Sequence, residues 1–140
     1  MNYLFVYGTL RSPINHAMHQ MLADHACLVG IGFMHGRLFN LGTYPGAVFG
    51  GDKQAKVWGE VYRLKPEVCQ HVLDILDDYE GCSTLDIQQA GGKNEYCREQ
   101  VSITLSYGQA LLAWVYLYNR DTTLLDEIPS GDYCEFVIAR

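Results

Sequence analysis

The sequence predicts an α+β fold: a small mixed sheet that curls or closes into a barrel, with two main helices packed against it. Three observations favour this class. Segments with strand patterns outnumber segments with helical spacing, hairpin turns separate several of them, and no strand–helix–strand rhythm recurs. At 140 residues the chain can bury its own core, and no repeat divides it, so we expect one domain over residues 1–140.

The elements can be placed along the chain from the spacing of their apolar residues. Strand patterns cover residues 3–7, 26–41 (as two strands broken near His35-Gly36), 47–49, 56–64, 95–105 and 109–117. A tight turn at Tyr107-Gly108 joins the last two strands into a hairpin. Helical spacing predicts one helix capped by Ser12, with Pro13 at its first position, and another with Pro66 and Glu67 in its first turn, while Ser130 or Asp132 could open a short closing helix.

Composition and charge exclude several kinds of partner. The net charge is −6 and the basic residues do not cluster, which argues against nucleic acid. No secretory signal is visible and no apolar stretch approaches the length of a membrane span, so we expect no membrane partner. The five cysteines are odd in number and never spaced as Cys-x-x-Cys, which is typical of reduced thiols in the cytoplasm.

Metal and cofactor chemistry finds little support in the motifs. None of the five histidines forms a metal-ligand spacing, and we expect His16 and His19 to face solvent because they fall off the apolar stripe of their helix. The turn after the first strand lacks the Gly-Lys-Ser/Thr ending of a Walker loop, and no Gly-x-Ser-x-Gly elbow is present. We therefore expect no metal and no cofactor.

The first strand ends in Val6-Tyr7-Gly8-Thr9-Leu10-Arg11, a candidate ligand-binding turn. Gly8 can take a positive φ and let a ligand approach the backbone closely. The N–H groups of Gly8, Thr9 and Leu10 have no obvious partners in a sheet, and a turn of such groups is a concave site for an anion. An ordinary strand-to-loop turn is the alternative interpretation.

Glu80 is the candidate general acid/base. It lies at the C-terminus of the predicted second helix, just before Gly81, where the helix dipole is negative. Together with three aspartates in the preceding turns, the dipole should raise the pKa of Glu80 toward neutrality, as proton transfer requires. A solvated acidic helix end is the alternative. Glu60 shares a strand face with large apolar groups, so it needs a partner or lines a cavity.

Seven short motifs, weak singly, follow one another along nearly the whole chain. They are Tyr7-Gly8-Thr9-Leu10, Tyr44-Pro45-Gly46, Gly59-Glu60-Val61-Tyr62, Leu76-Asp77-Asp78-Tyr79-Glu80-Gly81, Tyr96-x-Arg98, Trp114-Val115-Tyr116 and Ser130-Gly131-Asp132. In this order the sequence resembles the γ-glutamylcyclotransferase-like family, in particular its small bacterial and AIG2-like members. Tyr133 departs from the family pattern, standing where many relatives have Trp.

The resemblance implies a cyclotransferase fold and an enzyme acting on a γ-glutamyl amine or γ-glutamyl-amino-acid. In the family, the substrate's α-amine attacks its own γ-carbonyl and releases an amine and 5-oxoproline. Carried over, the turn of Tyr7, Gly8, Thr9 and Leu10 would hold the γ-glutamyl head, and Glu80 would shuttle the proton. We expect Tyr44 and Tyr116 to complete the substrate site.

Two alternatives remain at this point. A binding protein could keep the same pocket for a small carboxylate without turnover, although a carboxylate with a raised pKa favours an enzyme. Within the enzyme reading, Glu60 or Glu95 could be the working base in place of Glu80. The loop over residues 81–93 is of the kind that sets leaving-group preference, so the identity of the amine stays open.

Overall fold

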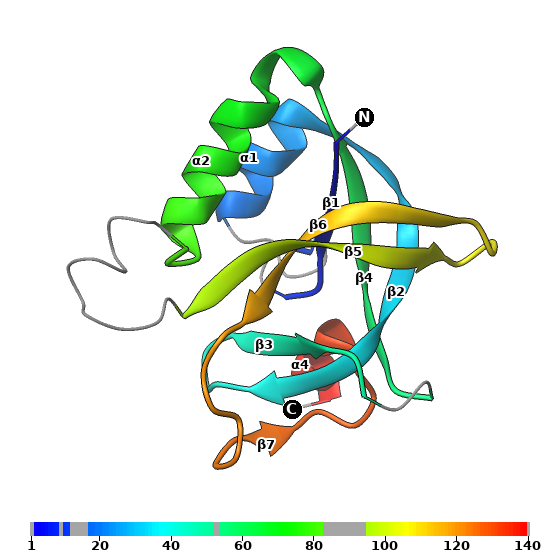
Figure 1. Cartoon of the computed structure of the whole chain (residues 1–140), viewed down its shortest axis with the longest axis vertical. Helices are drawn as coiled ribbons and strands as arrows, with labels where there is room; N and C mark the ends of the chain where they lie inside the picture. The colour runs from blue at the N-terminus through cyan, green and yellow to red at the C-terminus, as the bar shows by residue number, and fades with distance from the viewer. Residues whose placement is uncertain (1, 9, 12–16, 52–53, 83–94, 140) are drawn as a thin grey trace.

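The computed structural model describes residues 2–8, 10–11, 17–51, 54–82 and 95–139, which form a mixed α+β fold (Figure 1). Its strands are β1 (Tyr3–Val6), β2 (Ala26–Asn40), β3 (Pro45–Phe49), β4 (Lys56–Leu64), β5 (Tyr96–Leu105), β6 (Ala110–Tyr118) and β7 (Asp126–Glu127). The helices are α1 (Ala17–His25), α2 (Cys69–Tyr79) and α4 (Tyr133–Ala139), and a 3-10 turn, η2 (Pro66–Val68), precedes α2. None of the helices in these ranges is long and apolar enough to cross a membrane.

Five strands close into a barrel-like sheet in the order β2-β4-β1-β6-β5, which confirms the predicted fold class. The ring closes because β5 pairs back with β2, placing Gly32 opposite Leu105 and Phe33 opposite Thr104. β1 and β6 are parallel, and the other pairings in the ring are antiparallel. β3 and β7 pair with the far end of β2 and extend the sheet beyond the barrel.

The predicted break at His35-Gly36 is wrong, because β2 runs unbroken over 15 residues. It pairs with β4 up to His35, and from Gly36 onward it pairs with β3 instead. The glycine-containing pattern marks the point where the strand changes partner. Figure 1 shows β2 curving from the barrel into the smaller sheet below it.

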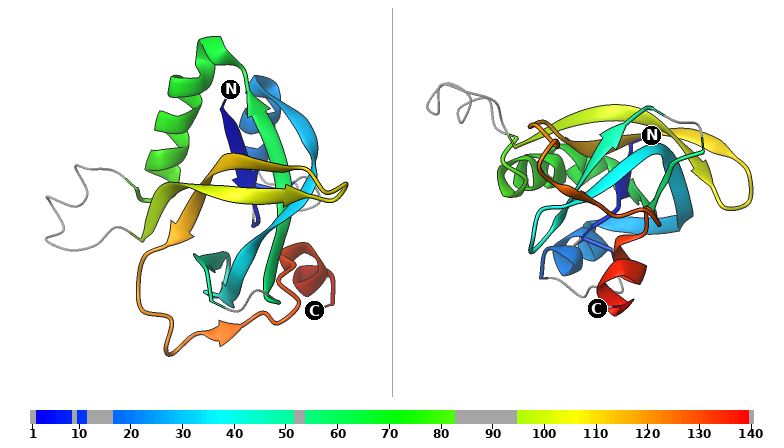
Figure 2. Two further views of the ribbon diagram at one scale, coloured as in Figure 1. Left: turned by 45° about the vertical axis from the view of Figure 1, so that its right-hand side comes forward. Right: turned by 90° about the horizontal axis from the view of Figure 1, so that it is seen from below.

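Side chains of the barrel strands face two separate cores. Period-two alternation along β1 sends Phe5 and Tyr7 into the barrel interior, whereas Leu4 and Val6 face the layer under α1 and α2. Figures 1 and 2 show α1 and α2 together against one side of the barrel, and α4 near the smaller sheet. The end of β1 therefore lies where both cores meet.

Local signals fix where the helices begin and end. The second helix opens at Pro66 as predicted, first as the 3-10 turn and then as α2. The Asp132 carboxylate accepts the N–H of Glu135 at 3.2 Å, so Asp132 opens the closing helix. The predicted start of the first helix at Ser12 lies outside the described residues.

The C-terminus of α2 ends in a Schellman motif that fixes Glu80. The N–H of Cys82 donates to the carbonyl of Asp77 at 2.8 Å, and the N–H of Gly81 donates to the carbonyl of Asp78 at 3.3 Å. Gly81 has φ 68°, the left-handed conformation that this motif requires. Glu80 thus sits at the C-cap, directly after the last residue of α2, with its N–H bonded to the carbonyl of Leu76 at 2.8 Å.

Candidate active site

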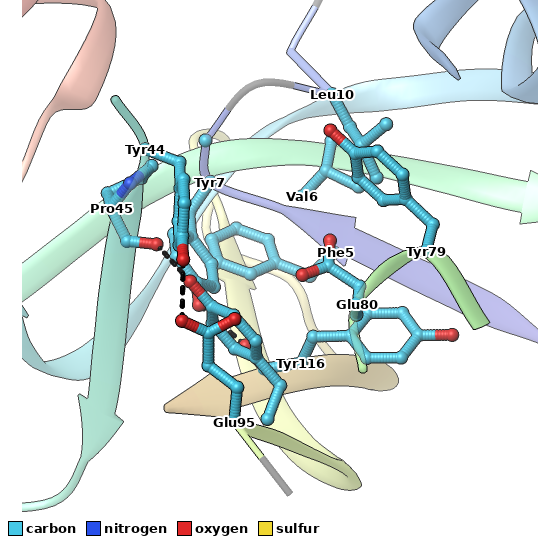
Figure 3. Close-up of a pocket in the computed structure, with 12 residues that line it drawn as sticks. Phe5, Val6, Tyr7, Leu10, Tyr44, Pro45, Tyr79, Glu80, Glu95 and Tyr116 are labelled. Atoms are coloured by element: carbon cyan, nitrogen blue, oxygen red, sulfur yellow. Dashed lines mark hydrogen bonds between the residues drawn. The ribbon is translucent and has the colours of Figure 1, made fainter. Parts of the chain in front are cut away.

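A cavity of about 250 Å³ opens where β1 ends, between the C-terminus of α2 and the starts of β3 and β5 (Figure 3). Its described lining residues are Phe5, Val6, Tyr7, Gly8, Leu10, Tyr44, Pro45, Tyr79, Glu80, Glu95, Tyr96 and Tyr116. The structure thus brings together the predicted site residues Tyr7, Gly8, Leu10, Tyr44, Glu80 and Tyr116. Thr9 lies outside the described residues.

Glu80 faces this cavity, and its pKa is raised to about 7. Burial of the carboxyl is the larger cause, and the negative charge of Glu95 is the second. The predicted direction is confirmed, but not the predicted contribution of the neighbouring aspartates. Asp77 is paired with Arg98, and Asp74 is exposed and accepts a hydrogen bond from Gln70.

Gly8 packs closely against another part of the cavity wall. Its φ is not positive, so the left-handed conformation expected for it is wrong. Instead, a Cβ at this position would lie 2.7 Å from Cγ of Pro45 and 3.0 Å from its Cδ. The chain turns immediately afterwards, since the N–H of Arg11 donates to the carbonyl of Gly8 at 3.0 Å. Glycine lets this turn pack directly on Pro45 at the cavity wall.

Three tyrosine hydroxyls at the cavity are bonded to other parts of the protein. Tyr7 donates to the carbonyl of Tyr116 at 2.5 Å and accepts the N–H of Ala47 at 3.1 Å. Tyr96 donates to the carbonyl of Pro45 at 2.7 Å, and Tyr116 donates to Asp77 at 2.7 Å. Burial raises the pKa of each of these phenols, so they stay protonated and hold the strands around the cavity.

Tyr44 is arranged differently, because its hydroxyl donates to Oε2 of Glu95 at 2.6 Å. This hydrogen bond is the main cause that raises the pKa of Tyr44 to about 12. Glu95 is held in turn through its backbone, whose carbonyl accepts the N–H of Asn119 at 2.8 Å. Both side chains are half-buried, and Glu95 brings a second carboxylate to the same cavity as Glu80.

Glu60 lies outside the cavity, in a separate buried polar cluster. Its carboxylate accepts the hydroxyl of Tyr62 at 3.1 Å, so it has the partner that its apolar face demanded. His19 lies beside Tyr62 and contacts the carbonyl of Leu10 through Nδ1 at 2.8 Å. The solvent-facing position predicted for His19 is therefore wrong, because the ring packs against the turn after β1.

A charged brace supports the end of α2 that carries Glu80. Arg98 on β5 donates from Nε to Oδ1 of Asp77 at 2.8 Å and from Nη2 to Oδ2 at 3.2 Å. Its guanidinium lies 4.4 Å from the ring centroid of Trp114, and Tyr116 donates to the same Asp77 carboxylate. The sequence pointed to Arg98 only through the Tyr96-x-Arg98 motif and gave no sign of its partner.

The cavity walls also contain residues that the sequence had not assigned to the substrate site. They are Phe5, Val6, Pro45, Tyr79 and Tyr96, of which all but Phe5 stood in the candidate turn or in the family motifs. Phe5 reads as an ordinary strand residue, and only the closure of the barrel brings it to the cavity. No group of three or more histidine, cysteine or acidic side chains among the described residues is arranged to hold a metal ion.

The fold is a small barrel, and solved structures of other proteins share it. YkqA from Bacillus subtilis superposes with a TM-score of 0.71 at 25% identity, covering 99% of this chain and 41% of that one. An AIG2-like protein from Mus musculus superposes with a TM-score of 0.68 at 24% identity, covering 95% and 88% of the two chains. This chain therefore spans less than half the length of YkqA.

The chain belongs to the family described as gamma-glutamyl cyclotransferase, AIG2-like, whose model matches residues 4–135. The Escherichia coli protein YtfP, named as a gamma-glutamylcyclotransferase family protein, is 34% identical over 133 residues, which cover 94% of this chain and 96% of YtfP. The solution structure of YtfP superposes with a TM-score of 0.60. The family resemblance inferred from the seven motifs is thereby confirmed.

Proposed function

We propose that the protein is an enzyme that converts a γ-glutamyl amine or γ-glutamyl-amino-acid into 5-oxoproline and a free amine. The observation that supports this most directly is Glu80, a carboxylate with a pKa of about 7 that faces the cavity. A side chain that both accepts and donates a proton works best when its pKa lies near the operating pH. Membership of the γ-glutamylcyclotransferase family supports the same reaction.

In this reaction the α-amine nitrogen forms a bond to the γ-carbonyl carbon, and the bond from that carbon to the amide nitrogen breaks. Glu80 accepts the proton lost by the attacking nitrogen and delivers it to the departing one, so no co-reactant is consumed. The backbone N–H groups of the turn after β1 would hold the α-carboxylate. Because the attack is intramolecular, positioning within the cavity supplies much of the acceleration.

No metal or cofactor takes part in this scheme, and both absences remain predictions. A cytoplasmic location is likewise proposed, and the five free thiols are consistent with a reducing compartment. The substrate is a small molecule, in keeping with a cavity of about 250 Å³.

The test is incubation with a panel of γ-glutamyl amines and γ-glutamyl-amino-acids, followed by detection of 5-oxoproline by mass spectrometry. We expect 5-oxoproline and the free amine in equal amounts. Binding of a γ-glutamyl compound with no 5-oxoproline from any member of the panel would favour a non-catalytic carboxylate-binding protein instead.

The pH dependence of kcat/KM should follow the ionisation of Glu80. We expect kcat/KM to rise with pH through an acid limb near pH 7, because Glu80 must lose its proton before it can act as the base. Removing the charge in Glu95→Gln should move this limb to lower pH, since the charge of Glu95 contributes to the raised pKa. A limb that stays in place in Glu80→Gln would belong to another group.

Gly8→Ala should weaken binding of a γ-glutamyl ligand about tenfold or more. The added Cβ lies 2.7 Å from Cγ of Pro45, so the turn or the start of β3 must shift, a cost of roughly 1–3 kcal/mol. Isothermal titration calorimetry measures the change. Gly30→Ala is the matched control, since a Cβ there meets nothing within 4 Å and should leave affinity unchanged. Equal effects of the two changes would contradict the packing argument.

A further inference from the structure

A buried arginine lies directly behind the turn after β1 and takes no part in the proposed proton transfer. Arg11 is 6% exposed and follows Leu10, which lines the cavity, but Arg11 itself does not belong to the described lining. Its N–H donates to the carbonyl of Gly8 at 3.0 Å and closes the turn. The carbonyl of Leu10 contacts Nδ1 of His19 at 2.8 Å. The Arg11 side chain therefore enters the protein on a side of the turn that does not face the cavity.

Arg11 forms an ion pair with Asp132, in the loop before α4. Its Nη1 donates to Oδ1 of Asp132 at 2.7 Å, although the two residues are 121 positions apart. The same oxygen accepts the N–H of Glu135 in the first turn of α4, and the N–H of Asp132 donates to Oγ of Ser130 at 3.2 Å. Asp132 is thus oriented by its own loop and helix, and it offers Arg11 a fixed acceptor.

The loop that carries Asp132 rests directly on the barrel. The carbonyl of Gly131 accepts the N–H of Trp58 on β4 at 2.8 Å. The approach is so close that a Cβ at Gly131 would lie 1.7 Å from the carbonyl oxygen of Lys56. The ion pair therefore connects the turn after β1 to a point that is itself fixed on β4.

A buried guanidinium is a costly choice if packing is its only role. Nε of Arg11 is buried, and no acceptor among the described residues meets it. A buried donor without a partner destabilises the folded state, and apolar side chains often replace buried ion pairs without loss of stability. A carboxylate shares these surroundings: burial is the main cause that raises the pKa of Tyr62, the charge of Glu60 adds to it, and the charge of Arg11 acts in the opposite direction. Groups placed against stability in this way are expected at functional sites.

We propose that Arg11 is a positioning residue, which fixes the turn after β1 through its ion pair with Asp132, so that the backbone N–H groups of the turn can hold the α-carboxylate of the substrate. This inference rests on the proposed function, in which that turn binds the γ-glutamyl head. Hydrogen bonds to a carboxylate require donors at defined positions, and a shifted turn would lose them. The substrate site thus depends on α4, which contributes no residue to the described cavity lining.

The experiment compares two ligands that differ only in the α-carboxylate. They are the n-butyl amide of γ-glutamate, joined through the γ-carboxyl group, and the n-butyl amide of γ-aminobutyrate. Calorimetry gives Kd for both, with Glu80→Gln present in every protein so that the ligand is not consumed. The γ-glutamyl amide should bind on the order of ten- to hundredfold more tightly, as hydrogen bonds to a charged group imply. With Arg11→Met the ratio should fall to within about threefold of unity. Equal affinities without Arg11→Met would overturn the proposal.

Variants of Asp132 distinguish positioning from direct attraction by the Arg11 charge. Asp132→Ser keeps a side chain that can cap α4 but is too short to reach Arg11, and it leaves the arginine charge in place. Positioning predicts that the affinity ratio falls as it does with Arg11→Met. A ratio that stays the same or rises would show direct attraction and overturn the proposal. Asp132→Asn keeps an oxygen that can accept the bond from Nη1, so it should retain most of the ratio.

Two controls separate positioning from a general loss of stability. Arg37→Gln removes the exposed ion pair with Glu127 and should leave the affinity ratio unchanged. Adding Arg11→Met to Asp132→Ser removes the stranded cation, so stability in urea unfolding should recover while the ratio stays low. If the ratio recovers together with the stability, the ion pair has a structural role only and the proposal is overturned.

Turnover separates this inference from the proposed function. In Asp132→Ser with Glu80 intact, KM of the γ-glutamyl amide should rise about tenfold while kcat stays within about threefold, because the carboxylate is held equally in the ground and transition states. If no 5-oxoproline forms but the affinity ratio falls in both variants, the reaction is wrong and the positioning role stands. If 5-oxoproline forms and the ratio survives both variants, the role is overturned while the reaction stands. Absence of both binding and turnover overturns both.

Discussion

Replacing Glu80 by Gln should lower turnover by roughly 10²–10⁴-fold, the usual contribution of a positioned acid/base. Glutamine keeps the size and hydrogen-bonding reach of the side chain but cannot carry the proton from one nitrogen to the other. Steady-state release of 5-oxoproline measures the loss. The affinity of a γ-glutamyl ligand should change little, because the proposed holding groups belong to the turn after β1.

The same substitution should make the protein more stable above neutral pH. The pKa of Glu80 is about 7 in the folded protein against 4.5 for the free side chain, so the folded state binds more protons between these values. The parent therefore loses stability as pH rises through about 7, by roughly 1–3 kcal/mol. Glu80→Gln removes this loss, so its advantage in urea unfolding should be present at pH 8 and absent at pH 4.

Asp78→Asn is the control for both measurements. Asp78 is exposed, lies two residues before Glu80 and contributes only its backbone carbonyl to the Schellman motif. Its substitution should leave turnover and the pH dependence of stability close to those of the parent. Full activity of Glu80→Gln, together with an inactive Glu95→Gln, would reassign the base to Glu95.

Breaking the brace at Arg98 should have the second-largest effect. Arg98→Met leaves the Asp77 carboxylate partly buried without its cation, which should lower the free energy of unfolding by about 1–3 kcal/mol. Turnover should fall by on the order of tenfold, because Asp77 lies three residues before Glu80 and its carbonyl belongs to the motif that fixes the helix end. Urea unfolding and steady-state kinetics measure the two effects.

Two further variants test this explanation. Arg37→Gln removes an ion pair with Glu127 that lies in solvent, and such pairs contribute only about 0–1 kcal/mol. Adding Asp77→Leu to Arg98→Met removes the stranded carboxylate and should recover part of the lost stability. If Arg98→Met is no more harmful than Arg37→Gln, the brace does not support the site.

Patterns that arise from nearest neighbours in the chain were predictable. The strand over 56–64 agrees with the bounds of β4, and Gly81 ends α2 in the predicted place, because alternation and helix termination depend on local geometry. The turn after β1, Tyr44 and Glu80 could be selected as candidates because each combines a local signal with a family motif. The structure brings their described residues to one cavity.

Features that depend on distant partners could not be predicted in the same way. Nothing near Asp77 indicates that Arg98 will pair with it, and nothing near Tyr44 indicates Glu95. The main cause of the raised pKa of Glu80 is burial, which becomes visible only when the barrel strands close beside α2. At Gly8 the expected positive φ does not occur, and the contact that excludes a side chain is with Pro45, which lies 37 positions away in the sequence.

The pairing of β1 with β6 has a consequence for how this protein acquires its cavity during folding. Tyr7 donates its hydroxyl to the carbonyl of Tyr116, 109 residues further along the chain. Contacts of such high sequence separation require closure of a long loop, whose entropy cost slows folding. On the ribosome, the first strand is synthesised long before its parallel neighbour exists. The cavity is therefore a late product of folding, assembled only when most of the polypeptide has emerged.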